Sequence, residues 1–279
     1  MTNFIGIEYG RGATAKIVEG GPALAPAAVK EMFPSGRWTI ISAAPVSADE
    51  CMADRFGENF EIQKQIYAAT PAERHIFIGG DHSVNFGHFT ALADKMPDED
   101  LCLVYIDAHL DIHTPESSQA EASGAPHGTN VRANLGQGDA RWLSLQKKFP
   151  ALRPENLFYL ASRSYEPSEI SFVRENNIFM RSASELQTDG ELDDAIAEIR
   201  RRIDGRPFVV SFDFDAIDPI YFKDVLVPES GGISMYAARR LTREFADAHS
   251  FEFVEYAPSG DETAAAAVRE LVGIAADYR

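Results

Sequence analysis

The chain has 279 residues, of which 45% are hydrophobic and 25% charged, so it is long enough to bury a large core and has the composition of a soluble globular protein. Its formal net charge of −17 argues against nucleic-acid or anionic-membrane binding, since both need basic surface. No apolar run of roughly eighteen residues and no basic leader segment is present, so we expect a cytoplasmic protein.

Short β-branched and aromatic runs alternate with longer amphipathic segments, which is typical of βα units around a mostly parallel sheet. Helical periodicity is clearest in residues 191–202 and 261–276, whose apolar stripes would cover the sheet. We expect one α/β domain over residues 1–279, because no segment has the character of an interdomain linker. The expected strands are residues 4–9, 38–43, 75–79, 101–106, 157–161, 178–181, 208–213 and 251–256.

Metal-capable side chains follow the expected strand at 101–106. Asp107, His109 and Asp111 stand at every second position, so in an extended chain their side chains would point the same way. Two carboxylates and an imidazole favour a divalent ion of the Mn, Fe, Co or Zn type. Taken alone, the pattern also fits a solvated loop after a strand.

Two further expected strands end in the same kind of residue. The strand at 208–213 runs into Asp213 and Asp215, and the strand at 75–79 runs through a Gly-Gly turn to His82. Asp218, before a proline, is expected to start a turn. Three such strand ends would be costly to bury without a cation. Six ligands exceed the needs of one catalytic ion, so we expect a binuclear centre with bridging carboxylates.

The segments GGDHS (79–83), DAHLD (107–111) and SFDFDAIDP (211–219) resemble, in this order, the ureohydrolase superfamily of arginase, agmatinase and formimidoylglutamase. Residues 18–22 are similar to its N-terminal motif, and the chain is most similar to arginase. The resemblance implies a three-layer α/β/α fold, two Mn²⁺ per chain and a trimeric or hexameric homo-oligomer. It places one Mn²⁺ on His82, Asp107, Asp111 and Asp213, and the other on His109, Asp107, Asp213 and Asp215.

The resemblance also implies roles in catalysis. Asp215 would carry the proton that the leaving amine needs, and His127 would exchange protons with solvent, since imidazole titrates in the right range. Glu255 would hold the guanidinium, which a carboxylate can pair with bidentately. Considered alone, Glu255 also fits a surface ion pair.

Two long loops, residues 114–132 and 221–234, follow ligand-bearing strands and are expected to shape a pocket. By resemblance, Ser123 would contact the carboxylate of an amino acid and Glu166 its α-amino group, although Glu166 beside a proline equally suits a helix start. His113 stands where the family has an asparagine and could line the site. Val227 replaces a family threonine and cannot supply its hydroxyl.

We therefore expect a binuclear manganese hydrolase that cleaves the small cationic guanidino substrate L-arginine to L-ornithine and urea by attack of a metal-bridging hydroxide. The alternative is agmatinase or another guanidino- or formimino-acid hydrolase, including formimidoylglutamase. A single-zinc, deacetylase-like amide hydrolase is a different class, but it would leave part of the ligand set unused. A non-catalytic binding relative is the third possibility.

Overall fold

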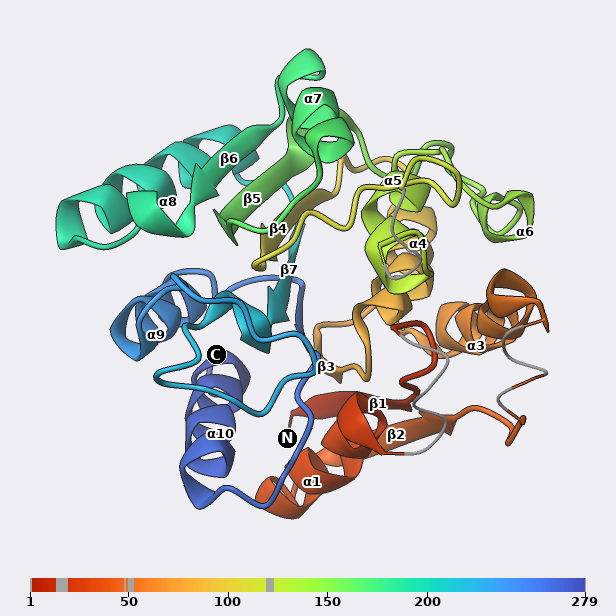
Figure 1. The fold of residues 1–279 in the computed structure, drawn as a ribbon, viewed down its shortest axis with the longest axis horizontal. Helices are drawn as coiled ribbons and strands as arrows, with labels where there is room; N and C mark the ends of the chain where they lie inside the picture. The colour runs from red at the N-terminus through yellow and green to blue at the C-terminus, as the bar shows by residue number, and fades with distance from the viewer. Residues whose placement is uncertain (1, 14–19, 48, 50–52, 119–122, 279) are drawn as a thin grey trace.

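The structure, a computed structural model, describes residues 2–13, 20–47, 49, 53–118 and 123–278 (Figure 1). Val18 and Glu19 of the expected N-terminal motif lie outside these residues. One sheet contains eight strands: β1 (Asn3–Glu8), β2 (Arg37–Ser42), β3 (His75–Ile78), β4 (Cys102–Ile106), β5 (Leu157–Ser162), β6 (Phe179–Ser182), β7 (Phe208–Asp213) and β8 (Ser250–Val254). Every neighbouring pair is parallel, so the expected eight-stranded parallel sheet is confirmed, with ends displaced by only one or two residues.

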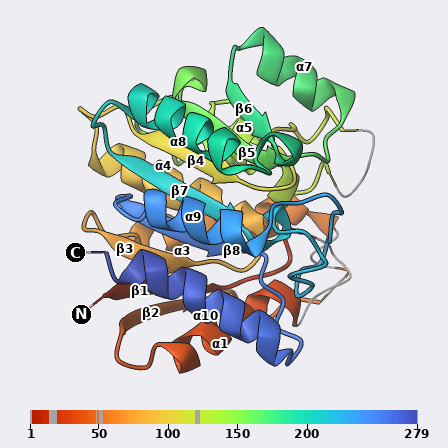
Figure 2. The ribbon, with the colours of Figure 1, turned by 90° about the vertical axis from the view of Figure 1, so that its left-hand side faces the viewer.

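Helices cover both faces of this sheet, which confirms the three-layer α/β/α fold (Figures 1 and 2). The helices are α1 (Ala25–Met32), α3 (Arg55–Ala69), α4 (Asn85–Lys95), α5 (Asn130–Asn134), α6 (Ala140–Leu143), α7 (Pro167–Glu175), α8 (Asp189–Ile203), α9 (Met235–Glu244) and α10 (Glu262–Ala276). In the described part of the chain, no helix combines the length and apolarity needed to cross a membrane.

Alternation along the central strands divides the core into two layers. In β4, Val104 and Ile106 belong to the cluster packed by α1, α8, α9 and α10, whereas Leu103 and Tyr105 pack with α4, α5 and α7. A strand buried on both faces needs apolar residues at nearly every position, and all five residues of β4 are buried. The core therefore holds β4 rigidly up to the point where its functional residues begin.

Helix α8 illustrates how the sequence sets the helical layer. Thr188 caps its first turn in a reciprocal capping box with Glu191, and Asp204 ends it in a left-handed conformation with φ of 48°. Its buried stripe (Leu192, Ala195, Ile196, Ile199 and Ile203) has the expected spacing. The predicted helices at 191–202 and 261–276 are thus confirmed as α8 and α10.

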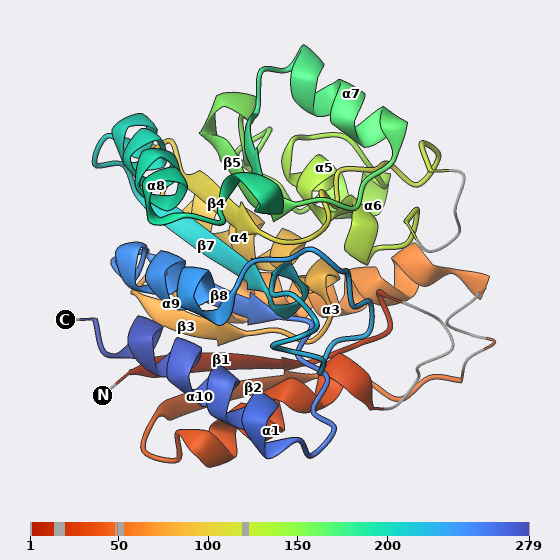
Figure 3. The same cartoon turned by 60° about the vertical axis from the view of Figure 1, so that its left-hand side comes forward.

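Strand order brings the motif-bearing strands together. The order is β2-β1-β3-β8-β7-β4-β5-β6, so β7 and β8 return from the far edge and fill the space between β3 and β4. Because the sheet is parallel, the carboxyl ends of these four strands meet at one edge, where α/β proteins form their sites. Figure 3 shows both termini at the opposite end of the molecule.

The turn after β3 depends on a close backbone approach. A Cβ added to Gly80 would lie 1.5 Å from the Tyr9 carbonyl oxygen, which also accepts the Asp81 N–H at 3.0 Å. No side chain fits there without moving β1 or β3. The glycine therefore fixes where the following residues begin.

We predict that Gly80→Ala lowers the free energy of unfolding by about 3 kcal/mol or more, because the clash is with backbone. Urea unfolding measures it. The control is Gly190→Ala in α8, where an added Cβ meets nothing within 4 Å. This change should raise stability by about 0.4–1 kcal/mol, and equal effects of the two substitutions would contradict the explanation.

Candidate metal centre

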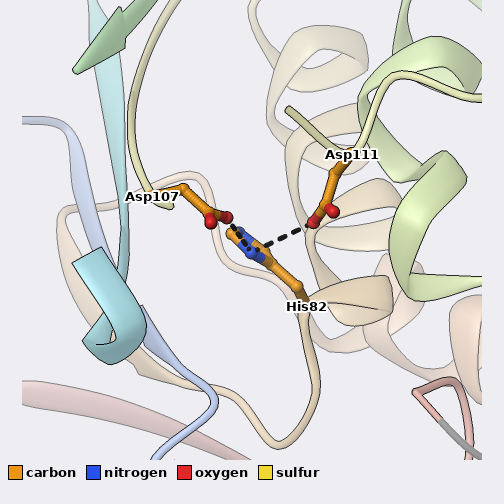
Figure 4. A group of neighbouring side chains, drawn as sticks. All are labelled: His82, Asp107 and Asp111. Atoms are coloured by element: carbon orange, nitrogen blue, oxygen red, sulfur yellow. Dashed lines mark ion pairs between the residues drawn. The ribbon is translucent and has the colours of Figure 1, made fainter. Parts of the chain in front are cut away.

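Three carboxylates converge on one nitrogen of His82, at the carboxyl ends of β3, β4 and β7. His82 Nδ1 lies 2.9 Å from Asp107 Oδ2, 3.2 Å from Asp213 Oδ2 and 3.4 Å from Asp111 Oδ2. Figure 4 shows His82 between Asp107 and Asp111. All four residues are buried, so solvent screens these charges little.

Two polar atoms of this cluster lie close together without being hydrogen-bonded. His82 Nδ1 and Asp107 Oδ2 are buried and have no hydrogen-bond partner among the described residues. The other ring nitrogen, His82 Nε2, lies 2.8 Å from Ser211 Oγ. Burial raises the pKa of Asp213 well above its usual value, and Asp215 and Asp107 raise it further. The carboxylate oxygens around His82 Nδ1 repel one another, and a bound cation would compensate their negative charge.

A second cluster shares Asp107 with the first. His109 Nδ1 lies 3.0 Å from Asp215 Oδ2 and 3.4 Å from Asp107 Oδ1. The two oxygens of Asp107 therefore face different histidines. This is the arrangement that a carboxylate bridging two ions would have, and each cluster has donor atoms close enough together to hold an ion.

The backbone reaches this geometry by a route that the sequence analysis did not predict. Strand β4 ends at Ile106, and the extended alternation expected through Asp111 is wrong, because Asp111 has φ of 49°. The chain turns there, and Tyr105 Oη donates to Asp111 Oδ2 at 2.8 Å. Asp107 and Asp111 thereby face His82, whereas His109 turns to Asp107 and Asp215 in the second cluster.

Two turns hold the β7 side of the site. Asp213 Oδ1 accepts the backbone N–H of Asp215 at 2.8 Å. The carboxylate of Asp218 accepts the backbone N–H groups of Ile220, Gly231 and Gly232 at 2.9, 2.7 and 3.0 Å. The turn expected at Asp218 is confirmed, and its carboxylate ties the long loop 221–234 to the strand end.

A cavity of about 470 Å³ opens onto both clusters. Both expected loops contribute to its wall. A larger cavity of about 610 Å³, near Thr2 and Arg74, lies at the other end of the sheet and has one acidic residue, Asp277. The first cavity is the better candidate because it brings together His82, His109, Asp111, His113, Ser123, His127, Glu166, Asp213, Asp215, Val227 and Glu255.

Glu255 and His127 are held at fixed points of this wall. Glu255 has φ of 62°, and its Oε1 accepts the His82 backbone N–H at 2.8 Å. It is only 7% exposed, so the surface ion pair considered for it is wrong. His127 Nδ1 lies 3.0 Å from the Gly12 carbonyl oxygen. Burial lowers the pKa of His127 to about 4, which leaves the ring neutral at pH 7.

At the outer wall, an imidazole lies between two carboxylates. His113 Nε2 is 3.3 Å from Glu169 Oε2 and 3.5 Å from Glu166 Oε1. Glu166 immediately precedes α7, and its backbone N–H donates to Glu169 Oε2 at 2.8 Å, while its side chain accepts the Ser118 hydroxyl. Glu166 therefore starts helix α7, as one of the two interpretations expected, and its side chain also lines the cavity.

Sequence reasoning missed three residues of the site. Glu169 is buried in the wall, and only its capping-box spacing from Glu166 could have indicated it. Glu229 also lines the cavity. Arg163 donates to backbone carbonyls of Ala161, Asp215, Ala216, Glu229 and Ser230 at 2.7–3.3 Å. Every residue has a backbone carbonyl, so the sequence does not indicate which carbonyls an arginine contacts, and the role of Arg163 could not have been predicted.

The chain is similar to known proteins along its length. A model of the arginase family matches residues 11–276. An arginase of Bacillus caldovelox is 32% identical over 193 residues, which cover 67% of this chain and 62% of that relative, less than two thirds of its length.

Solved structures show the same fold. The arginase of Entamoeba histolytica in complex with L-ornithine has a TM-score of 0.83 at 21% identity, covering 99% of this chain and 98% of that one. Formimidoylglutamase of Bacillus subtilis subsp. subtilis strain 168 has a TM-score of 0.75 at 16% identity, covering 98% and 85%.

We predict that Mn²⁺ at about 100 times its Kd stabilises the protein by about 2.7 kcal/mol for each ion bound, raising Tm by about 5 °C per ion. Asp213→Asn should diminish this rise, because it removes a charged oxygen from the His82 cluster. The apoprotein of this variant should be at least as stable as the wild-type apoprotein, because one of several crowded carboxylates is gone. Calorimetry with and without Mn²⁺ measures both effects, and an undiminished Mn²⁺ shift in the variant would refute the assignment.

Proposed function

Because this chain belongs to the arginase family, we propose that it binds two Mn²⁺ and hydrolyses the guanidinium group of L-arginine to L-ornithine and urea. The observation that carries the proposal is Asp107, whose two oxygens face His82 and His109 in separate clusters. A guanidinium is a poor electrophile, and two divalent cations at this place would supply Lewis acidity and lower the pKa of water. The proposed ligands are His82, Asp107, Asp111 and Asp213 for one ion and His109, Asp107, Asp213 and Asp215 for the other.

We assign binding of the guanidinium to Glu255. One of its oxygens is engaged by the His82 N–H, and the other is available to a guanidinium N–H in the cavity. Burial raises the pKa of Glu255 well above its usual value, and Asp81 raises it further, so a cationic substrate would stabilise the ionised form. Glu255 thereby orients the carbon that is attacked.

We assign proton transfer to two residues that line the cavity, Asp215 and His127. Asp215 Oδ1 accepts the Ala108 N–H at 3.1 Å and its carboxylate lines the cavity, and we assign to it the transfer of a proton from water to the leaving amine. His127 donates from Nδ1 to the Gly12 carbonyl, which leaves Nε2 to take up a proton and pass it to solvent; its lowered pKa means that the ring returns to the neutral form after each transfer. Both side chains are fixed by backbone contacts, as proton transfer at short range requires.

At the outer end, we assign the α-ammonium group of the substrate to Glu166 and its carboxylate to Ser123, with His113 beside them. The described cavity wall has no lysine or arginine and carries Glu166, Glu169 and Glu229. This charge favours a substrate with a cationic distal end. By analogy with the family, we also infer a homo-oligomer, trimeric or hexameric, and a cytoplasmic location.

The same acidic wall makes agmatine the second candidate substrate, since it carries a guanidinium and lacks a carboxylate. Val227 lacks the hydroxyl of the family threonine, which favours weak arginase activity or turnover of another guanidino or amidino substrate. Formimidoylglutamate carries two carboxylates and is disfavoured by this wall. The two clusters favour two ions over the single zinc of a deacetylase-like enzyme.

The test is turnover by Mn²⁺-reconstituted protein of L-arginine, agmatine and formimidoylglutamate in parallel. We expect urea with L-ornithine from arginine, at the highest kcat/KM of the three. Faster urea release from agmatine would retain the proposed centre and reject the role of Ser123, because agmatine lacks the carboxylate that Ser123 would contact. A protein that binds Mn²⁺ and releases neither urea nor formamide would support a non-catalytic relative.

We predict that Glu166→Gln raises KM for L-arginine by roughly tenfold to a hundredfold, because a charge-assisted contact contributes about 1.5–3 kcal/mol. Mn²⁺ affinity should not change, since Glu166 lies outside both clusters. Steady-state kinetics and Mn²⁺ titration measure the two effects. An unchanged KM would exclude this contact.

A further inference from the structure

Glu229 faces the outer nitrogen of His109. Glu229 Oε1 lies 3.8 Å from His109 Nε2 and accepts the Ser164 hydroxyl at 3.1 Å. This is the one carboxylate paired with His109 Nε2 among the described residues. The side chains are 34% and 26% exposed, so solvent screens their attraction only in part. The separation exceeds the roughly 2.7–3.2 Å of a hydrogen bond, so the hydrogen bond inferred below requires the two side chains to move closer together.

The backbone around Glu229 is fixed from two sides. Arg163 Nη2 donates to the Glu229 carbonyl at 2.7 Å and to the Asp215 carbonyl at 2.8 Å. On the other side, Asp218 accepts the N–H groups of Gly231 and Gly232. The loop that carries Glu229 is therefore tied directly to the segment that carries Asp215, and the side chain is held toward His109.

The two histidines of the centre face outward to different partners. In both, Nδ1 lies among the carboxylates and Nε2 lies on the far side, next to Ser211 Oγ for His82 and Glu229 Oε1 for His109. A histidine that binds a metal through Nδ1 carries its proton on Nε2. A carboxylate that accepts this proton fixes the tautomer and ring orientation and makes Nδ1 more basic.

We infer that Glu229 is a positioning residue of the metal centre: its carboxylate accepts the Nε2–H of His109 and holds Nδ1 toward the ion that His109 binds. The inference rests on the proposed function and adds to it a residue outside the ligand set. Glu229 acts on one of the two ions, because the His82 cluster has its own partner in Ser211. The centre is therefore asymmetric in its outer contacts.

The experiment is a Mn²⁺ titration of Glu229→Ala and Glu229→Gln, followed by electron paramagnetic resonance, which distinguishes single ions from coupled pairs. Wild-type protein should show two sites per chain and a coupled spectrum. We expect Glu229→Ala to weaken one Kd by roughly tenfold to a hundredfold and leave the other unchanged. At one Mn²⁺ per chain, the variant should then show the spectrum of an isolated ion.

The matched control is Glu116→Gln, which removes the same charge from an exposed position. It should leave both Kd values unchanged. Circular dichroism of the apoproteins monitors folding; if Glu229→Ala does not fold, the isosteric Glu229→Gln decides, with a smaller loss of affinity in the same site.

Two unchanged Kd values in the Glu229 variants would overturn the inference, and a raised substrate KM in that case would make Glu229 a substrate contact. Equal weakening of both sites with a lower apoprotein Tm would also overturn it, in favour of a structural role. Failure of the wild-type protein to bind two Mn²⁺ would reject the proposed function itself.

Discussion

The site depends on the electrostatic repulsion between buried carboxylates that crowd around two histidines. The repulsion is strongest at Asp107, since this residue is fully buried and faces His82 with one oxygen and His109 with the other. Asp111 and Asp213 add charge to the same region, and burial followed by the effect of Asp107 raises the pKa of Asp111 to about 7. A protein keeps such an arrangement when a cation compensates it.

The fold delivers these side chains by topology and then fixes them by backbone contacts. Because β7 and β8 return between β3 and β4, residues far apart in sequence meet at one sheet edge. Three backbone contacts then fix the positions of the loops: the close approach at Gly80, the turn at Asp218 and the carbonyl contacts of Arg163. The candidate site is thus formed by loops held on a rigid sheet.

The periodic features were predictable from sequence, because strands buried on both faces need continuous apolar runs, and all eight were found. Strand ends rich in Asp and His also indicated the clusters. The turn that brings Asp111 into place was not predictable, since a positive φ at a non-glycine residue depends on tertiary contacts. Arg163 and Glu229 were missed for a related reason, because their partners come from distant segments, whereas Glu169 had only its local capping-box spacing from Glu166 to indicate it.

The most direct test of a binuclear centre is diffraction from Mn²⁺-soaked crystals at the manganese absorption edge. We predict two anomalous peaks per chain, roughly 3.5 Å apart, on either side of Asp107. One peak should lie against His82 and the other against His109. A single peak, or a site filled only by one zinc, would contradict the account, because half of the clustered carboxylates would then have no cation to compensate them.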